Sequence, residues 1–297
     1  MKKEFIVITL LVLMILPFAT AGIADWFKKN VRLAPSQSTD VRIEVGNVAP
    51  SITSISPISP VSLNPAPSTT NVLFTFTATD PNDVTDLNDA SASSSFTKTG
   101  EPTRTGSCVF LSQTGTERTY QCTVTMQYFD APGTWDVAVS IQDSAGLTGT
   151  SSSTFSVNLL TDITISPTIV NFPTVVQGAS NVISSSPTTV TNRGNFQAPP
   201  GTLSITAFDL AGETLPAELI PATNLRAAGS SGAAVVCSTG NALSNNVITP
   251  ITSVNLPRGP SGSNTETIAY CLTLVPSAIS SQFYSATGAS GWIMTIS

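Results

Sequence analysis

The chain has 297 residues, of which 10% are charged, and its net charge is −6. This length is enough for about two domains. The acidic balance argues against a nucleic-acid partner, because binding to phosphates needs a surplus of Lys and Arg.

The sequence contains no histidine. This excludes Ser-His-Asp and Cys-His mechanisms and removes the commonest general base and zinc ligand. A glycosidase-type pair of carboxylates would need a cleft rich in aromatic and acidic residues, whereas aromatic residues make up 7% of the chain. We therefore expect a protein that is not an enzyme.

Residues 1–21 have the features of a secretory signal peptide. Lys2 and Lys3 precede the apolar run FIVITLLVLMILPF, and Ala19-Thr20-Ala21 supplies small residues for a signal peptidase. The run is shorter than the roughly 20 residues of a membrane-spanning helix. We expect cleavage after Ala21 and secretion, with an uncleaved N-terminal anchor as the alternative.

Residues 22–47 are expected to form an extended N-terminal arm. The aromatic pair Trp26 and Phe27 precedes any domain, so something must cover these side chains. The stretch DVRIEVG alternates apolar and polar residues, as an amphipathic strand does. Its apolar face consists of Val41, Ile43 and Val45. This strand either joins the sheet of a neighbouring copy or is the first strand of its own domain.

Two β-sandwich domains are predicted after the arm, at residues 48–158 and 159–297. The first contains the period-2 stretches 71–80, 119–127 and 133–143. Similar stretches continue through the second half, at 160–172, 189–195, 202–210, 247–256, 267–275 and 291–297. No segment after the signal peptide has a convincing helical period. The fold class is therefore all-β, with two sandwiches in tandem. Trp135 and Trp292 lie within alternating strands, which favours core packing over a sugar-stacking platform.

The four cysteines follow a signal peptide, which predicts an oxidising compartment and two structural disulfides. Three pairings are possible, and we favour Cys108–Cys122 and Cys237–Cys271 because each then closes one domain. In a hairpin centred on Gly115, Cys108 faces Cys122 directly.

The stretches FTFTATDPNDVTDLN and YFDAPGTWDVAVSIQDSAGLTGT resemble Ig-like, PKD- or cadherin-like modules of prokaryotic surface proteins. Such modules carry a strand ending in A-x-D-P and a later Y-x-D-x-P-G-x-W-x-V pattern closed by D-x-x-G. The stretches ITISPTIVNF and TVTNRGNF are similar to β-sandwich modules of large archaeal surface proteins. The resemblance implies an Ig-like scaffold and specifies no activity.

Loop carboxylates at strand ends bind calcium in related module families, and the acidic stretch TDPNDVTDLND holds several of them. The candidate ligands are Asp80, Asp83, Asp86, Asp130 and Asp143. The alternative is that Asp and Asn only form turns and caps here. For Asp143, at the first position of the turn DSAG, we favour the turn. No other cofactor is expected.

These features together predict an extracellular structural protein that assembles with copies of itself, head to tail, as a filament or surface-layer subunit. Strand donation by the arm would supply the contact. The alternative is a monomeric adhesin or carbohydrate-binding module that contacts cell-surface glycans.

Overall fold

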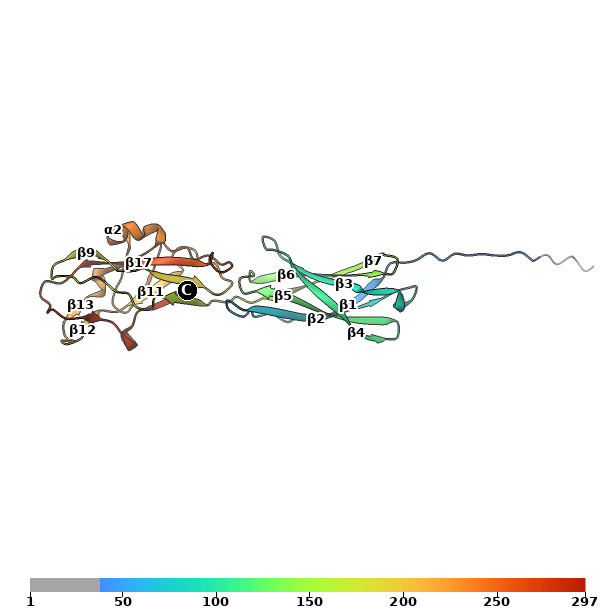
Figure 1. Ribbon diagram of the computed structural model, residues 1–297, viewed down its shortest axis with the longest axis horizontal. Coiled ribbons are helices and arrows are strands. Elements are labelled where there is room, and N and C mark those ends of the chain that lie inside the picture. Colours follow the sequence, from blue (N-terminus) through green and yellow to red (C-terminus); the bar gives the residue numbers. More distant parts are fainter. Residues whose placement is uncertain (1–37, 297) are drawn as a thin grey trace, which may run out of the picture. The chain divides into compact units, whose positions relative to one another are not determined.

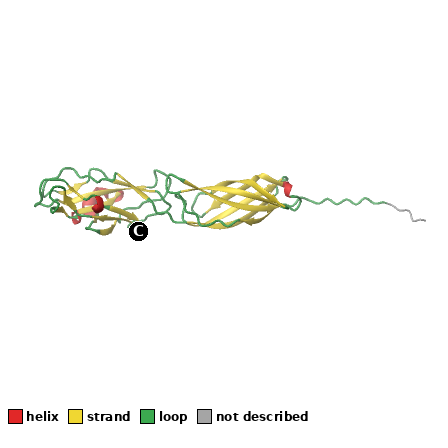
Figure 2. Cartoon of the chain, turned by 90° about the horizontal axis from the view of Figure 1, so that it is seen from below, coloured by secondary structure: helices red, strands yellow, loops and turns green. Residues whose placement is uncertain are grey.

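The computed structural model describes residues 38–296, which consist mainly of β-strands and their connections (Figures 1 and 2). From Asn47 onward the chain forms one compact unit. Within the described range, no helix has the length and apolar character needed to cross a membrane.

Seven strands build the first sandwich, and all of them pair antiparallel. They are β1 (Ser51–Ile55), β2 (Thr69–Thr79), β3 (Leu87–Thr97), β4 (Arg104–Thr114), β5 (Glu117–Gln127), β6 (Gly133–Asp143) and β7 (Thr148–Val157). Their order is β1-β2-β5-β4-β3-β6-β7. In Ig nomenclature this is the set ABED joined to CFG, the arrangement of a constant-type domain. The fold is therefore Ig-like.

Alternation of apolar and hydroxyl side chains builds the core of this sandwich. On β6, the residues Trp135, Val137, Val139 and Ile141 are all buried, whereas Asp136 and Ala138 between them are exposed. Strand β2 buries Phe74 and Phe76 in the same way, and Phe76 stacks on Tyr120 of β5. Side chains of a strand point alternately to its two faces, so the period-2 pattern itself directs these residues inward.

The first sandwich is closed at its edges. After β1 the chain continues to Val61, which forms a parallel bridge with Val157 of β7. The backbone of Pro50 lies so close to Gly149 of β7 that a Cβ there would approach the Pro50 carbonyl oxygen to 2.3 Å. All seven strands of the Ig arrangement come from residues 51–157, so this sandwich lacks no strand.

The second sandwich follows from residue 163. Its larger sheet has the order β15-β14-β17-β10-β8, with β9 also pairing with β17, and two three-stranded sheets have the orders β16-β11-β19 and β13-β12-β18. The strands are β8 (Ile163–Ser166), β9 (Ser180–Ile183), β10 (Thr188–Asn192), β11 (Leu203–Ala207), β12 (Leu210–Gly212), β13 (Leu219–Ile220), β14 (Leu225–Gly229), β15 (Asn241–Ala242), β16 (Val247–Pro250), β17 (Thr265–Leu274), β18 (Tyr284–Ser285) and β19 (Ile293–Ile296). Its core contains Leu203, Ile205, Leu225, Ile268 and Tyr270.

Short helical turns interrupt both sandwiches. They are η1 (Val84–Asp86), η2 (Ala222–Asn224), η3 (Ser230–Val235), α2 (Val236–Thr239) and η4 (Gly288–Ser290). No helix is predicted from the sequence at residues 230–239, where η3 and α2 follow each other. This segment is too short for a helical period to appear in the sequence.

Both disulfides join the pairs favoured from the sequence. Cys108 faces Cys122 in the register of β4 and β5, and Cys237 of α2 bonds Cys271 of β17. Gly115 forms the hairpin turn with φ +59°, a conformation that glycine adopts without strain. A bulge between Phe110 and Ser112 shifts the register near the turn. Each disulfide therefore links neighbouring parts of one sandwich.

Candidate functional sites: an acidic cluster and the N-terminal segment

Three of the five candidate calcium ligands lie together at one end of the first sandwich. Asp80 follows β2, Asp86 belongs to η1, and Asp143 is the last residue of β6. One carboxylate oxygen from each of the three lies within 4.8 Å of the other two. Asp80 and Asp143 are only 5% and 1% exposed, and Asp86 is half-buried. We call Asp80, Asp86 and Asp143 the acidic cluster.

Hydrogen bonds fix the orientation of Asp143. Its Oδ1 accepts from the backbone N–H groups of Ala145 (3.0 Å) and Leu147 (2.8 Å), which form the turn between β6 and β7. Its Oδ2 accepts from the side-chain amide of Asn47 at 2.8 Å. Asp143 therefore forms the turn that the DSAG sequence predicts. Its carboxylate also lies near those of Asp80 and Asp86.

Asp80 is satisfied on only one of its two oxygens. Its Oδ1 accepts from the backbone N–H of Asn82 at 2.8 Å, but its Oδ2 is buried and has no hydrogen-bond partner among residues 38–296. Asp86 accepts a short hydrogen bond from the hydroxyl of Ser144, and its backbone carbonyl accepts from the Ser144 N–H at 2.8 Å. The loops before β3 and after β6 are thus tied together around the cluster.

The other two candidate ligands lie elsewhere. Asp83 is exposed and caps η1 by accepting from the Thr85 N–H at 2.7 Å. This backbone hydrogen bond is the main cause that lowers the pKa of Asp83 below its ordinary value. Asp130 is fully buried and forms a bidentate ion pair with Arg104. Neither residue belongs to the acidic cluster.

Two residues that bond to the candidate ligands are not predicted from the sequence. The first is Arg104, which neutralises Asp130. The sequence indicates it only in that basic residues are scarce, since six follow Arg42. Asn47 closes over Asp143 although it belongs to the predicted arm rather than to the sandwich. An Asn immediately before a predicted module is a weak signal, because Asn is common in turns.

Residues 38–46 form no strand in the structure, and the first strand of the seven-stranded sheet is β1. The side chains of Val41, Ile43 and Val45 are 78, 83 and 81% exposed. Residues 41–45 are therefore not the first strand of the sheet that follows them. Of the two interpretations of this segment, the one that makes it the first strand of its own domain does not agree with the structure. The predicted signal peptide, Trp26 and Phe27 lie outside the described residues.

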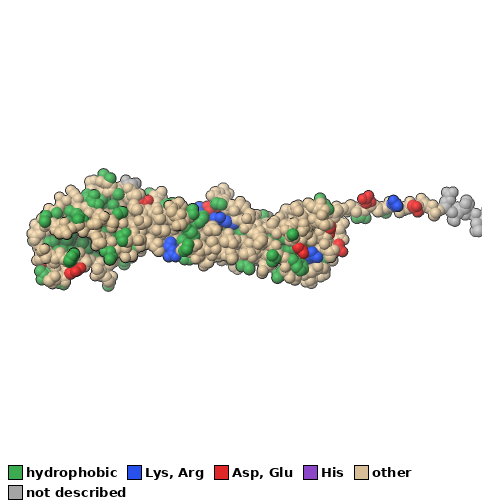
Figure 3. Space-filling model, in the orientation of Figure 1, with side chains coloured by type: hydrophobic (Ala, Val, Ile, Leu, Met, Phe, Trp, Pro, Cys, Tyr) green, Lys and Arg blue, Asp and Glu red, His purple; other side chains and the backbone are tan. Residues whose placement is uncertain are grey.

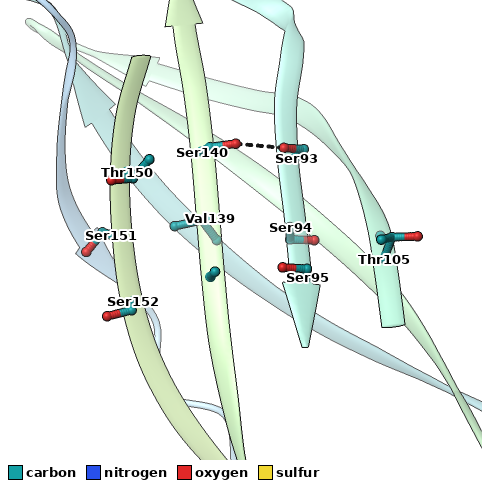
Figure 4. Close-up of a pocket in the computed structure, with 11 residues that line it drawn as sticks. Ser93, Ser94, Ser95, Thr105, Val139, Ser140, Thr150, Ser151 and Ser152 are labelled. Carbon is teal, nitrogen blue, oxygen red and sulfur yellow. Dashed lines mark hydrogen bonds between the residues drawn. The ribbon is translucent and has the colours of Figure 1, made fainter. Parts of the chain in front are cut away.

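A shallow hydroxyl-lined hollow of about 660 Å³ lies across β3, β4, β6 and β7. Figure 4 shows Ser93 of β3 beside Ser140 of the neighbouring strand β6, and their hydroxyl oxygens are hydrogen-bonded at 2.8 Å. No aromatic side chain lines this hollow. Trp135 is buried and donates to the Ala131 carbonyl at 2.8 Å, while Trp292 is half-buried and donates to the Phe208 carbonyl at 2.9 Å. Neither Trp provides a flat exposed platform for a sugar.

Comparison with known proteins adds little to this geometry. No protein-family model matches the sequence, and no curated protein matches it. Among solved structures, titin Ig tandem domains are similar with 10% identity over 85% of this chain and 96% of that chain, at a TM-score of 0.27. A carbohydrate-binding module from the β-sandwich superfamily is similar with 15% identity over 78% of this chain and 94% of that one, at a TM-score of 0.23.

The secreted serine protease VesC from Vibrio cholerae is similar with 11% identity over 79% of this chain and 51% of that chain, also at a TM-score of 0.23. At such scores these comparisons carry no argument about function, and the strand order of the first sandwich is the firmer evidence for the Ig-like fold.

Proposed function

We propose that this chain is an extracellular structural protein that assembles with copies of itself, and that residues 41–45 are donated as a strand to a neighbouring copy. The observation that carries the proposal is the exposed apolar face of Val41, Ile43 and Val45. A single strand does not stay ordered in water, so an amphipathic one needs a sheet to join. The proposed role is non-enzymatic, in line with the absence of histidine from the sequence.

We also propose that the protein is secreted and that its sandwiches are related to modules of prokaryotic surface proteins. Two disulfides suit an oxidising compartment. The side of the molecule in Figure 3 carries few, scattered charged groups among neutral polar and apolar ones. Such a surface has little charge repulsion to oppose contact between copies.

The sheet β16-β11-β19 of the second sandwich is the proposed acceptor of the donated strand. Only β11 pairs with β16 and with β19 within residues 38–296, so each has an outer edge without a strand. Val247, Ile248 and Ile293 on these outer strands are exposed apolar residues. Exposed apolar edge strands are templates for pairing with another chain. Because the first sandwich is complete, the second is the better acceptor.

The free energy that burial of the arm contributes to assembly is moderate. Burying the three arm side chains contributes roughly 1.5–3 kcal/mol each. Association itself costs an estimated 4–15 kcal/mol in lost freedom. The ladder hydrogen bonds of the added strand and further arm contacts must therefore supply the rest, so assembly is expected to depend on the whole apolar face. We therefore expect that replacing the central side chain, Ile43, prevents assembly.

The test is light scattering and electron microscopy of the purified protein, its Ile43→Asp variant and an Arg42→Gln control on the opposite face of the segment. We expect wild type and Arg42→Gln to assemble, and Ile43→Asp to remain a folded, disulfide-bonded monomer. Undiminished polymers of Ile43→Asp, or unfolding of its first sandwich, would refute strand donation.

A second candidate function is a monomeric surface module that binds carbohydrate. The hydroxyl-lined hollow in Figure 4 is the observation that favours it, because its many hydroxyl groups can exchange hydrogen bonds with a sugar. The lack of an aromatic lining makes it the weaker candidate. Wild type that stays monomeric at every concentration and binds glycans would favour this function instead.

A further inference from the structure

We propose that the acidic cluster of Asp80, Asp86 and Asp143 is a Ca²⁺ site. Oxygens bound to one Ca²⁺ at 2.3–2.6 Å lie at most about 5.2 Å apart. The three carboxylate oxygens of the cluster are within 4.8 Å of one another, so one ion can reach all three. Carboxylates are hard oxygen ligands, which Ca²⁺ prefers.

Among the described residues, no ion pair brings a positive charge to this cluster. Four ion pairs occur within residues 38–296, and none includes Asp80, Asp86 or Asp143. The buried Asp130 shows the contrast, because Arg104 neutralises it directly. Buried charges are normally paired with a counter-charge or bound to a metal. Three converging carboxylates without a basic partner therefore indicate a cation.

A second, independent observation is the free oxygen of Asp80. The side chain is 95% buried, and its Oδ2 has no hydrogen-bond partner, although the other oxygen accepts from Asn82. Buried polar atoms of native proteins are nearly always satisfied, so each exception needs an explanation. An ion that is bound beside Asp86 and Asp143 and takes Oδ2 of Asp80 as a ligand would satisfy this oxygen.

The surrounding hydrogen bonds position the cluster and leave ligand capacity. Asp143 is held at Oδ1 by two backbone N–H groups and at Oδ2 by Asn47, which leaves one lone pair of Oδ2 for a ligand. The three residues come from the β2–β3 connection and from the end of β6. Ca²⁺ takes six to eight oxygens, so second carboxylate oxygens and water would complete its coordination.

The site also adjoins the start of the compact unit at Asn47. Asn47 donates to Asp143, and the backbone N–H of Val48 donates to the side-chain oxygen of Asn82 at 2.9 Å. Bound Ca²⁺ would stiffen both of these acceptor loops and so fix residues 47 and 48. The inference rests on the cluster alone and holds whether or not the chain assembles.

The experiment is calorimetric titration of the EDTA-treated protein with CaCl₂, together with melting curves at increasing CaCl₂ up to about 10 mM, well above the dissociation constant of a weak extracellular site. The expected result is one Ca²⁺ per chain and a melting temperature that rises with CaCl₂, because an ion that binds only the folded state stabilises it. Absence of both binding heat and a shift in melting temperature would overturn the proposal.

Variants identify the ligands. Asp80→Asn should weaken Ca²⁺ binding by more than about tenfold, the loss caused by removing even a second-shell partner of a metal ligand. In EDTA it should melt no lower than wild type, because it removes like-charge repulsion, and a purely structural role predicts the opposite. Asp136→Asn, an exposed residue of β6, is the matched control and should bind like wild type.

If Asp80→Asn does not fold, Asp86→Asn serves in its place with the same expected loss. Binding that is unchanged in the folded variant, or equally weakened in Asp136→Asn, would refute the assignment. The monomeric Ile43→Asp variant should bind Ca²⁺ like wild type, which separates failure of this inference from failure of the proposed assembly.

Discussion

Replacing Arg104 with Met is expected to destabilise the first sandwich strongly. The Asp130 side chain is fully buried and that of Arg104 is only 17% exposed. Arg104 Nε lies 3.1 and 3.0 Å from the two carboxylate oxygens, and the Gln127 N–H donates to Oδ2 at 2.8 Å. After substitution, a buried carboxylate retains one backbone donor and no ion-pair partner, with only the charge of the more distant Arg258 acting on it.

The magnitude follows from the loss of this counter-charge. Two unit charges about 4 Å apart interact by about 4 kcal/mol at an effective dielectric constant of 20. Breaking a buried pair by removing one partner costs about 3–5 kcal/mol. Arg104 also lies over the ring of Phe129, at 5.7 Å from its centroid, which adds about 0.5–1 kcal/mol. Met retains the apolar stem, so most of the expected loss of about 3–5 kcal/mol is electrostatic.

Asp130→Asn should cost less, about 1–3 kcal/mol, because it leaves an Arg that can turn toward water and no buried charge. The assay is urea unfolding of both single variants and the double variant, with hydrogen exchange of β4 and β5 as the local readout. We expect the double variant to be less destabilised than the sum, by about 1–3 kcal/mol. Additive losses, or a loss below about 1 kcal/mol for Arg104→Met, would refute the buried charge pair. The Ca²⁺ response of Asp130→Asn should match that of wild type.

Two further predictions concern the second sandwich. Hydrogen bonds from the Tyr284 hydroxyl and from Ser280 lower the pKa of Glu218 from 4.5 to about 2, so its contribution to stability is complete above pH 4.5 and disappears as the pH falls toward 2. Melting curves of wild type and Glu218→Gln should converge over that range, and a difference independent of pH would contradict the assignment. Replacing Cys237 and Cys271 together with Ser opens a loop with a sequence separation of 34 and should lower the free energy of unfolding by about 4 kcal/mol in denaturant titrations. A loss below about 1 kcal/mol would show that the disulfide stabilises little.

Strand-level prediction succeeds where the two faces of a strand differ in polarity. In β6, the alternation from Trp135 to Ile141 defines the buried face, and the hairpin about Gly115 predicts that Cys108 faces Cys122. It is harder in β3, where Ala92 and Ser94 point inward among other small polar residues. The stretch 247–256 shows a third outcome, since only Val247–Pro250 forms a strand. Pro250 has no N–H to extend a ladder.

The candidate sites, too, are predicted from the sequence only in part. The sequence identifies acidic residues near strand ends, but only the folded chain separates Asp130, which pairs with Arg104, from the three that converge. Which carboxylates converge depends on contacts between residues far apart in the sequence. The hydrogen bond from Asn47 to Asp143 is an example of such a contact. The exposed apolar face of residues 41–45 follows from period-2 alternation alone, whereas its partner sheet does not.

Hydrogen exchange of residues 38–46 tests the proposed strand donation most directly. In assembled wild-type protein, the backbone amides of residues 41–45 should exchange more than about a hundredfold more slowly than in the Ile43→Asp monomer, because they would bond to a sheet of the neighbouring copy. Val137, in the centre of β6, is the internal control and should be protected equally in both. Rapid exchange of residues 41–45 in assembled material, at the rate of the monomer, would contradict strand donation.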